Sequence, residues 1–143
     1  IENNVRKTIV DENPVNPKYF DSMATLLDEI IKQRREQAIS YQDYLEQIKA
    51  LAKKVVNPTE NSNQSYPTSV DTPAKQAIYD NFGNDEVLTT KIDTAVRYTK
   101  KADWLGDRFK EREIANAVRQ EAAGYNINIV DVMELIKAQK EYH

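Results

Sequence analysis

Apolar residues recur at three- and four-residue steps through much of the chain, which is the spacing that puts side chains on one face of an α-helix. The clearest case is residues 16–56, which hold two such stripes. The first comprises Phe20, Met23, Leu27, Ile30 and Ile31, and the second Tyr44, Leu45, Ile48, Leu51, Ala52 and Val55. Only a short connection around residues 38–40 separates the stripes, which predicts an antiparallel helical hairpin.

Capping residues stand where both helices of this hairpin are predicted to begin. Asn16 is followed by Pro17, a residue favoured at the first helical position because its missing N–H group costs nothing there. Ser40 precedes the second stripe, and Asp43 follows in the first turn, where a negative charge is stabilised by the helix dipole. Caps and periodicity therefore predict the same two elements.

Shorter helical stripes fill the remainder of the chain. Thr72 and Pro73 predict a helix start and Gly83 its end, and Asn84 is expected to cap the helix that follows. Asp107 and Asn128 are expected to cap two more. The predicted fold class is all-α, a helical bundle of about five to six helices built on the antiparallel hairpin, with no strand.

Helical periodicity and local composition together divide the chain into three predicted parts. Residues 1–56 are expected to form an N-terminal arm and the hairpin, with residues 1–13 either a short helix or an extended arm. Residues 57–70 are rich in Asn, Ser, Thr and Pro, which predicts a flexible linker. Residues 71–143 are expected to be a helical bundle that completes one C-terminal domain.

Residues that carry common catalytic chemistry are sparse. The chain has no cysteine and its single histidine is His143, so thiolate, zinc and nucleophile–histidine sites are not expected. Its three glycines are too far apart for a phosphate-binding loop, and no lysine stands two places after an acidic residue, a spacing common in metal-dependent nucleases. We therefore expect no catalysis and no cofactor in this chain and name no metal-binding residue, although an all-oxygen magnesium or calcium site stays open. An apolar run long enough to cross a membrane is also missing, and a start at Ile1 suggests a piece of a longer, soluble cytoplasmic protein.

Charge is unevenly distributed along the chain. The net charge is −3, yet residues 91–119 hold eight basic and five acidic residues, whereas the rest of residues 57–143 hold three basic and nine acidic ones. This basic segment is either an ordinary solvated surface or a binding site for nucleic acid or an acidic partner. If it binds a partner, the candidate residues are Arg97, Lys100, Lys101, Arg108, Arg112 and Arg119.

Two features refine that hypothesis. In a helix starting at Asp107, Arg108, Arg112 and Arg119 fall within about 40° of one another, on the side away from the apolar stripe. Nearby Trp104 is interpreted either as a core anchor or as an interface hot spot.

Four stretches resemble a known family in their amino-acid sequences and in their order along the chain: NPVNPKYFDSM, LLDEIIKQRREQAISYQDYLEQIKALAKKV, YPTSVDTPAKQAIYDNFGNDE and KIDTAVRYTKKADWLGDRFKEREIANAVRQ. They are similar to the C-terminal part of the R subunit of type I restriction enzymes, over about residues 4–119. Residues 121–143 resemble the closing helix of that family less distinctively.

The resemblance implies a role in DNA restriction in a bacterial cytoplasm. The intact R subunit is an ATP- and Mg²⁺-dependent DNA translocase and site-specific deoxyribonuclease, whose nuclease and ATPase domains precede the helical C-terminal region. That region is expected to dock the motor onto the methyltransferase core formed by the M and S subunits. Duplex DNA, contacted by residues 91–119, is the alternative partner. No catalytic residue of the family matches a position in this chain.

Overall fold

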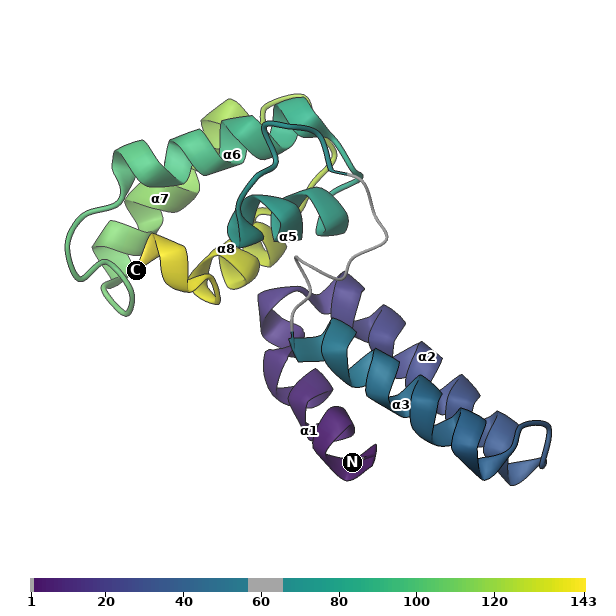
Figure 1. The fold of residues 1–143 in the computed structure, drawn as a ribbon. Helices are drawn as coiled ribbons and strands as arrows, with labels where there is room; N and C mark the ends of the chain where they lie inside the picture. The colour runs from purple at the N-terminus through teal and green to yellow at the C-terminus, as the bar shows by residue number, and fades with distance from the viewer. Residues whose placement is uncertain (1, 57–65) are drawn as a thin grey trace. The chain divides into compact units, whose positions relative to one another are not determined.

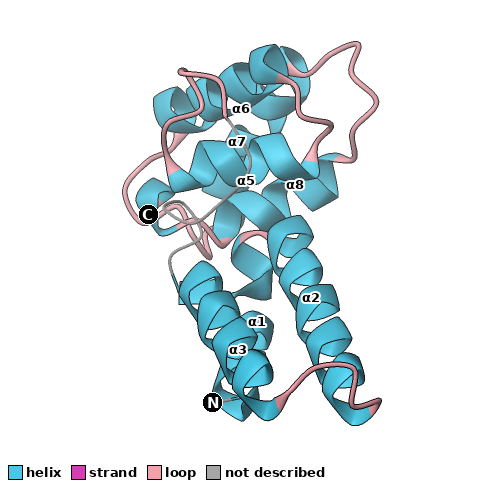
Figure 2. Cartoon of the chain, turned by 45° about the vertical axis from the view of Figure 1, so that its right-hand side comes forward, coloured by secondary structure: helices cyan, strands magenta, loops and turns pink. Residues whose placement is uncertain are grey.

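The computed structural model describes residues 2–56 and 66–143, and within these ranges the chain forms helices and loops without any β-strand (Figures 1 and 2). The all-α prediction is confirmed, with seven α-helices in the described ranges instead of five or six, and two short 3₁₀ helices. The chain divides into two compact units, Ile1–Ser65 and Tyr66–His143.

The first unit contains the predicted antiparallel hairpin. Its elements are α1 (Glu2–Glu12), η1 (Asn13–Val15), α2 (Pro17–Arg35) and α3 (Tyr41–Val56). The Tyr19 hydroxyl, at the start of α2, donates a hydrogen bond to the Lys54 carbonyl, near the end of α3, over 2.7 Å. The two helices therefore run in opposite directions, side by side in Figure 1. Both predicted caps are confirmed, since Asn16 accepts from the Tyr19 N–H and Ser40 from the Asp43 N–H.

Residues 2–12 are the helix α1 rather than an extended arm. Val5 and Ile9 are buried in the same core as Leu27 of α2 and Ile48 of α3. The hairpin alone would leave part of that apolar surface in water, and α1 covers it. The core of this unit is thus a three-helix core.

The end of α2 is set by Gln37, which has no feature in the sequence that predicts a helix end. Gln37 has a φ of 57°, in the left-handed region that usually holds glycine. The Ala38 N–H bonds to the Gln33 carbonyl and the Gln37 N–H to the Arg34 carbonyl. These two bonds form a Schellman motif, which turns the chain towards α3.

The second unit consists of four α-helices and a closing turn. They are α5 (Pro73–Asn81), α6 (Glu86–Thr99), α7 (Arg108–Glu121), α8 (Ile129–Lys137) and η2 (Lys140–Tyr142). The predicted caps Thr72, Asp107 and Asn128 are confirmed, because the side chain of each accepts a hydrogen bond from a backbone N–H of the first helical turn.

The predicted cap of α6 is wrong by one residue. Asn84 has a φ of 55° and its N–H bonds to the Tyr79 carbonyl, so it belongs to the turn after Gly83 that ends α5. The cap is Asp85, whose carboxylate accepts from the Leu88 N–H over 2.9 Å. An aspartate satisfies this position as well as an asparagine does.

Part of the predicted linker belongs to the second unit. Residues 57–65 lie outside the described residues. In residues 66–70, which were included in the linker, Val70 is buried and the Tyr66 hydroxyl donates to Asp80 over 2.7 Å. Tyr66 and Val70 therefore attach this segment to the bundle, and the second unit begins at Tyr66 rather than at residue 71.

The turn η2 closes the core of the second unit. Tyr142 is fully buried, and its hydroxyl donates to Asp93 of α6 over 2.7 Å. Its carbonyl accepts from the Trp104 indole N–H over 2.8 Å. The preceding Glu141 accepts from the Ala74 N–H at the start of α5 over 2.7 Å. Trp104, which is 1 % exposed, is therefore a core anchor and not an interface residue.

Candidate partner-binding surface

Three of the six basic candidates form ion pairs or hydrogen bonds within the second unit. Arg97 pairs with Asp93 on its own helix and with Glu141. Burial alone would lower the pKa of Arg97, but the two carboxylates raise it. Lys100 donates to the Tyr142 carbonyl over 3.1 Å, and Lys101 pairs with Glu113 over 2.8 Å. The contacts of Arg97 and Lys100 fasten η2 to α6.

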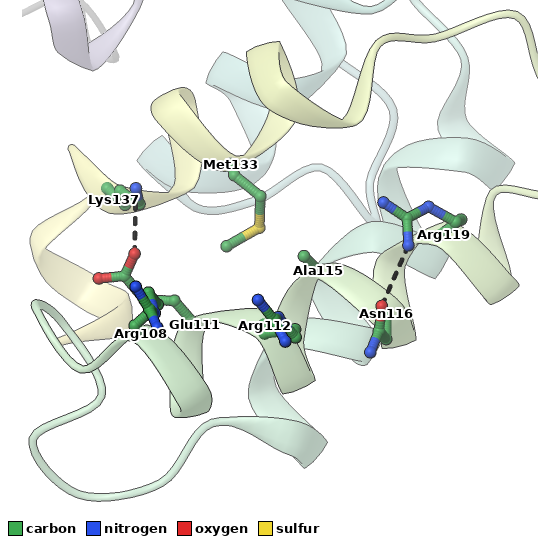
Figure 3. Close-up of a pocket in the computed structure, with 8 residues that line it drawn as sticks. All are labelled: Arg108, Glu111, Arg112, Ala115, Asn116, Arg119, Met133 and Lys137. Atoms are coloured by element: carbon green, nitrogen blue, oxygen red, sulfur yellow. Dashed lines mark hydrogen bonds and ion pairs between the residues drawn. The ribbon is translucent and has the colours of Figure 1, made fainter.

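The other three candidates lie together on α7, as predicted. Asp107 fixes the start of this helix by accepting from the Phe109 and Lys110 N–H groups. Ile114 and Val118 are fully buried, and one face of the helix is left exposed. Arg108, Arg112 and Arg119 occupy that face and line a single depression (Figure 3).

These arginines keep their charge available. Arg119 donates to the Asn116 side chain over 3.0 Å, and the Arg108 guanidinium lies 5.9 Å from the centre of the Phe109 ring. Neither contact neutralises a charge. Within residues 2–56 and 66–143, no carboxylate forms an ion pair with Arg108, Arg112 or Arg119, and Arg112 forms no hydrogen bond.

An ion pair across the two helices forms one end of the depression. Lys137 of α8 lies 3.0 Å from Glu111 of α7, and the second oxygen of Glu111 accepts from the Gly106 N–H over 2.7 Å. The hydrogen bond from Lys137 lowers the pKa of Glu111, burial opposes this, and the Gly106 N–H adds to the lowering. The only carboxylate that lines the depression is therefore already satisfied.

Two apolar side chains and the polar Asn116 form the rest of the depression. Met133 of α8, 7 % exposed, points into it from one side, and Ala115 of α7 lies opposite (Figure 3). The volume is about 490 Å³. Met133 reaches this depression because α8 packs against α7, and the helical period of the sequence does not predict that packing. Lys137 was missed for the same reason.

Groups suited to metal chemistry do not come together in the described part of the chain. No three His, Asp or Glu side chains there lie close enough to hold an ion. Among the described helices, none combines the length and the apolar character that crossing a membrane requires.

The chain was also compared with known proteins. No family model, curated protein or solved structure matches it. The resemblance to type I restriction R subunits therefore stays a prediction from the sequence.

Proposed function

We propose that this chain is a docking module, which attaches the R subunit of a type I restriction enzyme to its methyltransferase core. In this proposal the chain itself is not an enzyme. ATP hydrolysis, with its Mg²⁺, and DNA cleavage belong to other domains of the parent subunit. The partners are the M and S subunits, and the contact is made by the exposed face of α7.

The observation that carries the proposal is the row of Arg108, Arg112 and Arg119. Lys101, another of the candidates, forms an ion pair with Glu113 of α7. Three arginines on one face without such a partner in the described residues favour a binding role. The planar guanidinium group suits carboxylates and phosphates equally well, because it can form two parallel hydrogen bonds to either.

Duplex DNA is the second candidate partner, because the same arginines could contact phosphates. DNA contacts release condensed counterions, so the logarithm of the affinity should fall with the logarithm of the salt concentration, with a slope of about 0.9 per phosphate contacted. A protein interface of the same charge would show a weaker dependence on salt.

The test is a variant in which Arg108, Arg112 and Arg119 are all changed to Gln. We expect it to fold normally, since none of the three is buried. It should lose retention of the M and S subunits in a pull-down. The same variant is titrated with fluorescent duplex DNA at several salt concentrations, and anisotropy reports binding.

A matched control removes the same charge elsewhere. Lys7, Lys32 and Lys49 are exposed on the first unit, and changing all three to Gln should leave retention unchanged. If both triple variants retain the methyltransferase as the unchanged chain does, the arginine row is not the docking surface. Binding of DNA without any binding of the methyltransferase would overturn the docking function itself.

A further inference from the structure

The depression beside α7 combines two kinds of surface that a simple phosphate site does not need together. Arg108, Arg112 and Arg119 supply unpaired positive charge, while Met133 and Ala115 supply an apolar wall. Its volume of about 490 Å³ is within the range of roughly 300–1,000 Å³ that is typical of ligand pockets. There is space for more than one side chain of a partner.

The charge of the depression indicates which groups would enter it. Four cationic side chains and one carboxylate line it, and that carboxylate, Glu111, is held by Lys137 and the Gly106 N–H. An entering anion therefore meets three arginines and no free negative charge among the lining residues. Carboxylates are complementary to this arrangement.

The apolar wall formed by Met133 and Ala115 favours a ligand that also carries an apolar group. Met133 has a flexible, polarisable side chain, and methionine is common on surfaces that adapt to a partner's side chain. Phe109, one residue after Arg108, is 70 % exposed, and the Arg108 guanidinium lies 5.9 Å from the centre of its ring. An apolar side chain between two acidic ones would contact these groups while its neighbours pair with arginine.

The charge of the whole second unit distinguishes a protein segment from a duplex. Residues 66–143 contain eleven basic and thirteen acidic residues, a net charge of −2. A duplex extends beyond the depression and would lie over a unit that repels it, whereas a short acidic segment can lie within the depression alone. Several of the basic residues are also neutralised internally, Arg97 and Lys101 among them.

We propose that the depression between α7 and α8 receives a short acidic segment of the partner protein, in which an apolar side chain is flanked by carboxylates. The carboxylates pair with Arg108, Arg112 and Arg119, and the apolar side chain packs against Met133. This inference rests on the docking function proposed above and specifies its chemistry.

The experiment uses the whole chain and three fluorescent probes. One is a short peptide of glutamates around a central leucine, the second has serine in place of leucine, and the third is duplex DNA. The variant is Arg112→Gln, chosen because Arg112 forms no hydrogen bond or ion pair within the described residues. Lys140→Gln is the matched control, since Lys140 is exposed in the same unit but does not line the depression.

We expect the leucine peptide to bind more tightly than the serine peptide and than DNA. Arg112→Gln should weaken it by roughly three- to tenfold, the loss expected for one exposed, charged hydrogen bond. Lys140→Gln should not weaken it. Equal binding of the two peptides, equal affinity of the two variants, or tighter binding of DNA would each overturn the proposal.

A pull-down of the M and S subunits with the same variants separates this inference from the docking function. If the unchanged chain and Arg112→Gln both retain the methyltransferase equally, docking stands and the depression is not its site. If the unchanged chain does not retain the methyltransferase, the docking function fails. If the leucine peptide still binds more tightly than the serine peptide, the depression recognises an acidic segment with an apolar side chain, but on a partner other than the methyltransferase.

Discussion

Removing the hydroxyl of Tyr142 tests how η2 closes the second unit. The side chain is fully buried, and its hydroxyl donates to the Asp93 carboxylate over 2.7 Å. Tyr142→Phe keeps the ring and its packing and deletes only this donor. Asp93, which is 5 % exposed, would then keep the Arg97 guanidinium, 2.9 Å away, as its charged partner.

The expected loss follows from these contacts. A hydrogen bond to a charged group contributes about 1.5–3 kcal/mol to the free energy of unfolding. Because Arg97 still satisfies the carboxylate, we expect the lower part of that range, about 1.5–2 kcal/mol. For a domain of about 60–100 residues, that corresponds to a fall in Tm of roughly 6–16 °C.

Urea denaturation followed by tryptophan fluorescence measures this directly. Trp104 is the only tryptophan of the chain, and its indole donates to the Tyr142 carbonyl, so the signal reports the second unit. Tyr98→Phe on α6 is the matched control. Tyr98 is 87 % exposed, and the same chemical change there should alter the unfolding free energy by less than about 0.5 kcal/mol.

The pH dependence of the unfolding free energy gives a second measure of the hydrogen bond between Tyr142 and Asp93. Burial, reinforced by the hydrogen bond to Asp93, raises the pKa of Tyr142 above its ordinary value. The unfolded chain therefore releases this proton first, at about pH 10, and the stability that the hydroxyl contributes is lost as the pH rises further. Above about pH 10, the difference in unfolding free energy between the unchanged chain and Tyr142→Phe should narrow by roughly 1.4 kcal/mol per pH unit.

Two outcomes would refute this reasoning. If Tyr142→Phe and Tyr98→Phe unfold at the same urea concentration, the hydrogen bond to Asp93 contributes nothing to stability. If the difference between the unchanged chain and Tyr142→Phe stays constant from pH 8 to pH 11, burial does not disfavour the ionised tyrosine.

Two further predictions concern the first unit. Ile48 is 1 % exposed, so Ile48→Asp would bury a carboxylate without a partner and should lower the unfolding free energy by several kcal/mol, measured by circular dichroism during heating. Lys49→Asp, at an exposed neighbour, is its control, and near-normal stability of the Ile48 variant would contradict the packing of α3. Gln37→Gly should instead stabilise the unit by about 1 kcal/mol, because glycine adopts a φ of 57° without steric cost. A lower Tm for this variant would contradict that assignment.

The hairpin was predictable because its information is local. The stripes of α2 and α3 need only a helical period, and the caps Asn16 and Ser40 lie next to the helices that they begin. The error at α6 has a local cause as well. Asn84 and Asp85 are both good caps, and the left-handed turn that starts at Gly83 uses Asn84, which leaves the cap position to Asp85.

The candidate site was predictable only in part, because some of its features depend on contacts between residues that are far apart in the sequence. The arginine row of α7 follows from helical geometry alone. The engagement of Arg97 and Lys100, in contrast, depends on Glu141 and Tyr142, more than forty residues further along the chain. Periodicity carries no information on contacts at that separation, nor on the packing of Met133 against α7.

The closing turn also has a consequence for the order in which the chain folds. The hairpin joins helices that are neighbours in sequence, and such contacts form quickly because only a short loop has to close. The second unit is completed by contacts between residues 67 apart, Ala74 and Glu141, and 49 apart, Asp93 and Tyr142. We therefore expect the hairpin to fold before the second unit, with burial of Trp104 among the last events.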